Sequence, residues 1–131
     1  MQQPYILAVG DTFTDAFIKL HEDSAKVVEA NGKEWLCVEF GAKFSYDYVD
    51  IVKAVGPSPN AAVAFSRLGL KAGLTTYVGD DETGRETVTY LQSQNVDTST
   101  VSVQPGKKSS YWYVLRYGAD RTMLTANEHF D

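Results

Sequence analysis

The stretch from Val55 to Gly84, VGPSPNAAVAFSRLGLKAGLTTYVGDDETG, decides how the rest of the chain is organised. It opens with a Gly-Pro-Ser-Pro turn, in which Ser58 is suited to cap a helix and Pro59 to occupy its first position. Gly69 is placed to end that helix in a left-handed conformation. Small and apolar side chains at helical spacing predict the buried face of the helix: Ala61, Ala64, Phe65 and Leu68.

The second half of this stretch predicts a strand and another helix. Residues 72–78 are mostly apolar and β-branched, which is typical of a strand. Asp81 is expected to cap a helix that runs through Gln94, and Gly84 in its first turn indicates a close backbone contact. A short strand is expected at 101–103. Strands that alternate with helices indicate a parallel α/β sheet of the doubly wound, Rossmann-like kind.

The first strand is predicted at Tyr5–Val9, a continuous apolar run of the kind that is buried on both faces of a parallel sheet. The segment from Gly10 to Asp15 follows it, at the strand end where ligands bind in open α/β sheets. Asp15 is therefore a candidate for holding substrate hydroxyls, because a carboxylate can accept hydrogen bonds from two neighbouring O–H groups. The alternative that Asp15 only caps a turn stays open.

Residues 18–55 are expected to form a subsidiary β-rich unit. A strand begins at Ala16, and Asn31-Gly32 is a strong signal for a tight hairpin between two further strands. A last extended segment leads up to Val55. Both ends of this unit join segments that carry candidate site residues, so it is a candidate lid, and the simpler alternative is a decorated edge of the main sheet.

A second hairpin is expected after residue 108. Its first strand, Ser109–Tyr117, is strongly aromatic, and its second strand runs over 121–126 after a Gly118-Ala119-Asp120 turn. Trp112 lies on one face of the first strand and is a candidate for lining a substrate pocket. The alternative is that this aromatic face is core.

Composition narrows the function classes. A chain of 131 residues with 44% hydrophobic residues fits one globular domain, and a net charge of −5 argues against nucleic-acid or acidic-membrane binding. The single cysteine, Cys37, permits no internal disulfide. With neither a signal-peptide pattern nor an apolar run of about 20 residues, we expect a cytoplasmic protein. The two histidines have no metal-ligand spacing, so no metal site is expected in these residues.

Several of these features together resemble the ribokinase-like (PfkB) carbohydrate kinases. Asn60, Ala62, Gly69 and Gly79 stand at the spacing N-x-A-x6-G-x9-G. The sequence VGDDETG at 78–84 and the order of the surrounding elements also match. The resemblance covers about residues 4–127. It implies that residues 1–131 form the N-terminal part of a ribokinase-like domain, an incomplete, mostly parallel α/β sheet with a β lid at about 18–55.

The resemblance also implies a reaction, the ATP-dependent phosphorylation of a hydroxyl on a sugar or nucleoside, with Mg²⁺ as the expected companion of ATP. Carried over by position, Asp15 resembles the substrate-hydroxyl aspartate of the family, Asn60 its substrate-contacting asparagine and Gly56 the second glycine of its Gly-Gly pair. Val55 replaces the first glycine of that pair, which is expected to stiffen a hinge. The 78–84 motif is expected to be structural.

The family's catalytic stretch, which resembles D-T-x-G-A-G-D, has no match in these 131 residues. We therefore expect the chain to carry the sugar side of the site without the general base or the ATP-binding residues, and to be inactive alone. Two alternatives stay open: a non-catalytic polyol-binding module, and a module that forms homodimers through exposed lid strands.

Overall fold

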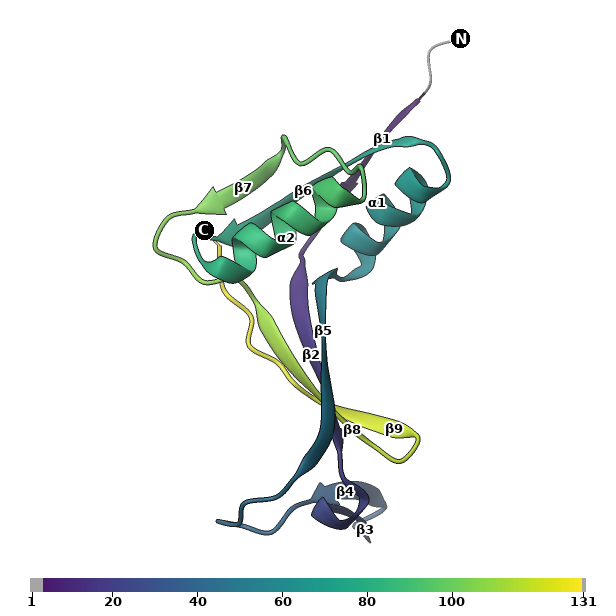
Figure 1. Cartoon of the computed structure of the whole chain (residues 1–131), viewed down its shortest axis with the longest axis vertical. Coiled ribbons are helices and arrows are strands. Elements are labelled where there is room, and N and C mark those ends of the chain that lie inside the picture. Colours follow the sequence, from purple (N-terminus) through teal and green to yellow (C-terminus); the bar gives the residue numbers. More distant parts are fainter. Residues whose placement is uncertain (1–3, 131) are drawn as a thin grey trace.

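The main sheet is parallel and three-stranded. The computed structural model describes residues 4–130, and Figure 1 shows this sheet with two helices packed in front of it. The strand order is β1-β6-β7 and every pairing is parallel. The sheet is formed by β1 (Tyr5–Val9), β6 (Lys71–Gly79) and β7 (Val101–Gln104). The strand, helix, strand, helix, strand pattern predicted from sequence is confirmed.

Both helices pack on the same face of this sheet. Helix α1 (Pro57–Arg67) and helix α2 (Glu82–Ser93) share one hydrophobic core with the middle strand. Leu74 of β6 and Leu91 of α2 are both fully buried in it. Burying two leucines contributes about 3–6 kcal/mol of transfer free energy, so this core holds the helices against the sheet.

The other face of the sheet is open in the residues that the structure describes. Leu7, Val9 and Tyr77 are 46%, 67% and 50% exposed. The prediction that β1 is buried on both faces is therefore wrong for this chain. The reason is that β1 is an edge strand and both described helices cover the opposite face.

Helix α1 begins two residues earlier than predicted. Gly56 is the N-cap, and Pro57 and Pro59 both fall in the first turn, where a missing N–H breaks no helical hydrogen bond. Ser58 does not cap the helix, because its hydroxyl donates instead to the carbonyl of Val9, 2.8 Å away. The predicted apolar face is also rotated: the buried side chains are those of Pro59, Ala62 and Val63.

The end of α1 and the start of α2 follow the sequence predictions. Gly69 adopts a φ of 84° just beyond α1, and its N–H donates to the carbonyl of Ser66. Asp81 caps α2 by accepting a hydrogen bond from the N–H of Gly84 at 2.9 Å. A Cβ on Gly84 would collide with the carbonyl of Gly79, which confirms the close contact expected there.

A second, four-stranded sheet begins where the chain leaves β1 of the main sheet. Its strand order is β5-β2-β8-β9, and β2 begins at Phe13 rather than at Ala16, because the chain extends almost directly from the end of β1. The sheet pairs β2 with β8 in parallel and with β5 antiparallel. Its strands are β2 (Phe13–Leu20), β5 (Tyr46–Val55), β8 (Tyr111–Tyr117) and β9 (Asp120–Leu124). The predicted 109–126 hairpin thus belongs to this sheet.

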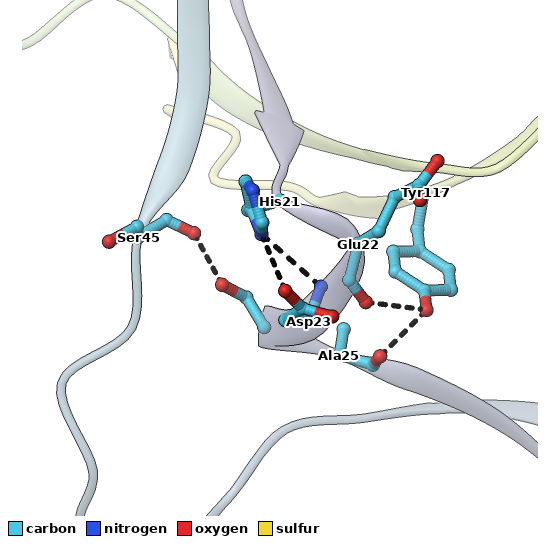
Figure 2. A network of polar contacts seen from close by, with 7 residues as sticks. His21, Glu22, Asp23, Ala25, Ser45 and Tyr117 are labelled. Carbon is cyan, nitrogen blue, oxygen red and sulfur yellow. Dashed lines mark hydrogen bonds and ion pairs between the residues drawn. The ribbon is translucent and has the colours of Figure 1, made fainter.

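A small hairpin lies at the far end of the four-stranded sheet. Strands β3 (Lys26–Ala30) and β4 (Lys33–Cys37) meet at Asn31 and Gly32, whose φ values are 54° and 70°, as the Asn-Gly signal predicted. Figure 2 shows how the short helix η1 (Glu22–Ser24) is attached beside it. The hydroxyl of Tyr117 donates to the carbonyls of Glu22 and Ala25, so the end of β8 holds this connection in place.

Candidate functional site

Asp15 lies inside β2, not in the turn where the sequence suggested it. It pairs with Val52 of β5 and with Trp112 of β8. Neighbours across parallel strands project to the same side of a sheet, so the Asp15 and Trp112 side chains share one face. Strand position thus gives Asp15 a fixed direction that a turn residue would lack.

The environment of the Asp15 carboxylate is unusual for a surface strand. Its Oδ1 atom is buried and has no hydrogen-bond partner among the described residues. Burial raises the pKa of Asp15 above its ordinary value, because a desolvated carboxylate is less stable when charged. Asp15 lines a hollow of about 370 Å³ on the same face of the sheet. The lining of this hollow also includes Phe17, Val114, Arg116, Asp120 and Arg121.

Trp112 forms part of an aromatic wall next to Asp15. Its ring stacks on that of Phe13, with centroids 4.3 Å apart and an interplanar angle of 28°. The indole N–H donates to the Oδ1 atom of Asn127 at 2.8 Å. The stacking and the hydrogen bond together fix the orientation of the indole ring.

Gly56 also lies close to Phe13. Its φ of 130° is one that side-chain-bearing residues rarely adopt, and a Cβ there would lie 2.9 Å from the carbonyl oxygen of Asp11 and 3.5 Å from the Phe13 ring. Two features of this position require glycine: the φ of 130°, and the close approach of the segment that follows β1.

Val55, which replaces a glycine of the family pattern, is an ordinary strand residue here. It pairs with Phe13 at the end of β5. The left-handed conformations fall on its neighbours, Ala54 with a φ of 53° and Gly56. A register shift between Phe13 and Asp15 accompanies them, so a β-bulge at this point aims the chain into α1.

Asn60 is exposed in the first turn of α1. Its backbone N–H donates to the carbonyl of Gly56 at 3.0 Å, which ties it to the same turn. No contact described in residues 4–130 joins its side chain to Asp15 or Trp112. The structure thus brings Asp15 and Trp112 together, and Phe13 connects them to Gly56. The Asn60 side chain is exposed four residues after Gly56.

Three residues of this region were not found by sequence reasoning. Phe13 lies two residues before Asp15, and residues two apart in a strand share a face. A strand predicted to begin at Phe13 instead of Ala16 would have identified it. Asn127 gives no signal, because its role depends on the β8–β9 hairpin returning the chain to Trp112. Arg116 reaches the hollow only through the register of β8.

The 78–84 motif is structural, as expected. The carboxylate of Asp81 accepts hydrogen bonds from the Ser109 backbone N–H at 2.9 Å and from the Ser109 hydroxyl at 2.8 Å, in addition to the α2 cap. Burial raises the pKa of Asp81, but the hydrogen bonds from Ser109 and Gly84 outweigh it and the net pKa is lowered. This carboxylate is fully engaged in joining α2 to the segment before β8.

Other kinds of site are not formed by the described part of the chain. Within residues 4–130, no group of three histidine, cysteine, aspartate or glutamate side chains is arranged to hold a metal ion. No helix described there has the length and apolar character needed to cross a membrane.

The parallel α/β sheet, with a second β-sheet that begins at the carboxyl end of its first strand, places this chain in the ribokinase fold class. The ribokinase of Arabidopsis thaliana, solved with ribose and ATP, superposes with a TM-score of 0.75 over 98% of this chain and 37% of its own, at 14% identity. The nucleoside kinase of Methanocaldococcus jannaschii gives a TM-score of 0.70 over 95% of this chain and 37% of its own, at 17% identity. These likenesses confirm the fold class expected from the sequence.

Sequence comparison supplies the family. The pfkB family of carbohydrate kinases matches residues 50–129, and the chain belongs to that family. The 2-dehydro-3-deoxygluconokinase of Thermoproteus tenax is 39% identical over 62 residues, which cover 47% of this chain and 19% of the relative. The 5-dehydro-2-deoxygluconokinase of Bacillus velezensis is 46% identical over 59 residues, which cover 44% of this chain and 18% of the relative. The matched region thus spans about a fifth of these curated relatives.

Proposed function

We propose that this chain supplies the sugar-binding part of a kinase that transfers a phosphoryl group from ATP to a hydroxyl of a sugar or nucleoside. The observation that supports it most directly is the Asp15 carboxylate, whose buried Oδ1 has no partner within the described residues. Hydroxyl groups of a polyol are donors that would satisfy this oxygen. Because the unpartnered charge is costly, ligand binding at Asp15 recovers free energy that folding leaves unused.

The neighbouring residues have complementary roles in this proposal. The stacked rings of Phe13 and Trp112 offer an apolar surface for the carbon face of a sugar. Gly56 brings the backbone close to the segment that follows β1. Asn60 supplies one donor and one acceptor for hydroxyls once its exposed side chain turns toward the ligand. These residues bind and orient the substrate, and the four-stranded sheet acts as a lid that limits water access.

The described helix starts do not fit the phosphates of ATP. A phosphate cradle needs free backbone N–H groups at a helix N-terminus. Helix α1 has prolines at 57 and 59, and the Gly84 N–H of α2 is already donated to Asp81. We therefore assign ATP and Mg²⁺ to the full-length kinase and to none of the residues described here.

The names of the relatives narrow the substrate. Both are deoxygluconokinases, which favours a substrate of the gluconate kind over a nucleoside. A cytoplasmic location belongs to the same proposal, because the single cysteine, Cys37, permits no internal disulfide and disulfides are rare in cytosolic proteins.

A homodimer through the lid is a further part of the proposal. Strand β5 is an edge strand of the four-stranded sheet, and Tyr46, Tyr48 and Ile51 on it are 58%, 45% and 55% exposed. An apolar edge of this kind invites pairing. Sedimentation velocity should show a dimer that Ile51→Lys converts to a monomer, and a wild-type monomer at all concentrations contradicts it.

The kinase proposal is tested by a phosphorylation assay on the protein as its gene encodes it. Gluconate-type acids, neutral sugars and nucleosides are each offered with ATP and Mg²⁺, and ADP release is measured. The expected result is turnover of one class, which Asp15→Asn abolishes. Residues 1–131 alone should bind the substrate without turnover. Tight binding without turnover by the encoded protein would instead support a polyol-binding module.

A further inference from the structure

Two arginines face each other at the end of the hollow that Asp15 lines. Arg116 of β8 pairs directly with Arg121 of β9, and both contribute to the wall of the hollow. Like charges directly opposite each other on paired strands are destabilising. Their juxtaposition at the hollow that Asp15 lines therefore calls for a compensating negative charge.

The chain itself does not supply that charge. Among the contacts described in residues 4–130, neither the Arg116 nor the Arg121 guanidinium forms a hydrogen bond or an ion pair. The two other arginines of the chain are partnered: Arg67 donates to the Oε1 atom of Gln94 and Arg85 lies 3.8 Å from Asp80.

The nearest acidic candidate in the hollow is Asp120. Its carboxylate accepts the backbone N–H of Arg121 at 2.7 Å and forms no ion pair with either guanidinium within the described part of the chain. Asp120 therefore closes the hairpin turn and leaves both guanidiniums free to bind a ligand.

We propose that Arg116 and Arg121 form a subsite for the carboxylate of a sugar acid whose hydroxyls are held at Asp15. This rests on the sugar-binding function proposed above and adds the substrate's charged group to it. Arg116 is four residues beyond Trp112, the residue level with Asp15. At about 3.3 Å per residue that separation is about 13 Å along the strand. An arginine side chain that extends back toward Asp15 shortens this gap, so a short carbon chain could join a hydroxyl at Asp15 to a carboxylate at the two guanidiniums.

The shared chemistry of the subsite is an oxyanion bound by the forks of two guanidiniums, which fits a carboxylate or a phosphate ester. The surroundings favour the carboxylate. Asp15 and Asp120 line the same hollow, and their negative charges repel a doubly charged phosphate more strongly than a singly charged carboxylate.

The test measures binding to the 131-residue chain by calorimetry at low salt, with three probes: D-gluconate, the neutral polyol D-glucitol, and D-glucose 6-phosphate. Gluconate is expected to bind about 10-fold or more tightly than glucitol, because hydrogen bonds to charged groups are strong. Added salt should narrow the difference. Arg116→Gln and Arg121→Gln should each remove it, while the matched control Arg85→Gln should preserve it.

The outcomes separate this inference from the proposed function. Equal affinity for gluconate and glucitol, or arginine variants without effect, overturns the subsite and leaves the polyol site standing if Asp15→Asn still abolishes glucitol binding. Tighter binding of D-glucose 6-phosphate than of gluconate overturns the carboxylate assignment. Failure of all three probes to bind overturns both proposals.

A second measurement is the thermal stability of the protein, first without ligand and then with gluconate. If the two guanidiniums repel each other without compensation, Arg116→Gln should raise the thermal midpoint of the free protein at low salt, and Arg85→Gln should not. Gluconate should then stabilise the wild type and not the Arg116→Gln variant. A lowered midpoint for Arg116→Gln in free protein contradicts the uncompensated pair on which the subsite depends.

Discussion

The Trp112 ring stacks on the Phe13 ring at a centroid distance of 4.3 Å, and this pair joins two strands that are almost a hundred residues apart in the chain. Trp112 is level with Asp15, and Gly56 approaches the Phe13 ring. The stack is therefore the physical link between the two sequence signals that first indicated a substrate site.

This link gives a fluorescence test. Trp112 and Trp35 are the two tryptophans of the chain, and Trp35 is half exposed on the distant β4. In a Trp35→Phe variant, saturating D-glucitol should change the emission of Trp112. In Trp112→Phe the change should vanish, and affinity should fall roughly 2- to 10-fold through loss of stacking area and of the bond to Asn127. Emission changes arising from Trp35 would place the ligand elsewhere.

Gly56→Ala should destabilise the fold. The substitution forces an alanine to a φ of 130° and sets its Cβ 2.9 Å from the Asp11 carbonyl, for an expected loss of about 1–3 kcal/mol in the free energy of unfolding. Gly106→Ala is the matched control, since Gly106 also has a positive φ, of 73°, but open space around it. Urea denaturation should show a clearly larger loss at position 56, and equal losses would contradict the close approach.

Asp15→Asn should improve stability while removing function. A carboxyl group whose pKa is raised in the folded state binds its proton more tightly there than in the unfolded chain. Stability therefore falls as the pH rises from the unfolded pKa through the raised pKa, and the loss is complete above it. The amide carries no such charge. Urea unfolding should therefore favour the variant at pH 8 more than at pH 4, and calorimetry should show that polyol binding is lost. A variant less stable at pH 8 than the wild type contradicts the desolvated charge.

For the stability that Asp81 contributes, we predict the opposite pH dependence. Its pKa is lowered in the folded state because Ser109 and Gly84 donate hydrogen bonds to the carboxylate. Such a group contributes stability above its unfolded pKa, and the contribution is lost as the pH falls through the folded pKa. Asp81→Asn keeps an oxygen that can cap α2, but it removes the charge and one of the two oxygens that accept from Ser109 and Gly84. It should therefore lose about 1 kcal/mol at pH 7 and little at pH 2.

For this comparison Asp80→Asn is the control, because Asp80 makes only a long, exposed ion pair with Arg85. Unfolding measured from pH 7 down to pH 2 should leave this variant close to wild type throughout. Equal pH profiles for the two variants would show that the Ser109 bonds do not stabilise the charged form of Asp81.

Local signals in the sequence predicted the elements well. Gly69, Asp81 and the Asn31-Gly32 pair each depend on a few neighbouring residues, and each does in the structure what its chemistry requires. The start of α1 was mispredicted for a tertiary reason: Ser58 bonds to Val9, 49 residues away, and no local rule weighs that bond against a cap.

The site was predictable only as far as its strands were. Asp15 and Trp112 could be named individually from the strand end, the aromatic pattern and the family resemblance. Their adjacency depends on the parallel pairing of β2 with β8, a long-range choice that neither strand encodes alone. The opposed arginines were invisible for the same reason, since Arg116 meets Arg121 only through the register of the β8–β9 hairpin.

The pairing of β2 with β8 also sets the order in which this protein can assemble. Residues 13–20 leave the ribosome early, but their parallel neighbour spans 111–117, so one edge of β2 has no strand to pair with until those later residues have been made. Closing so long a loop is slow. During synthesis the β2–β5 pair exposes backbone donors and acceptors next to apolar side chains, which makes this nascent edge the point most open to aggregation or to capture by chaperones.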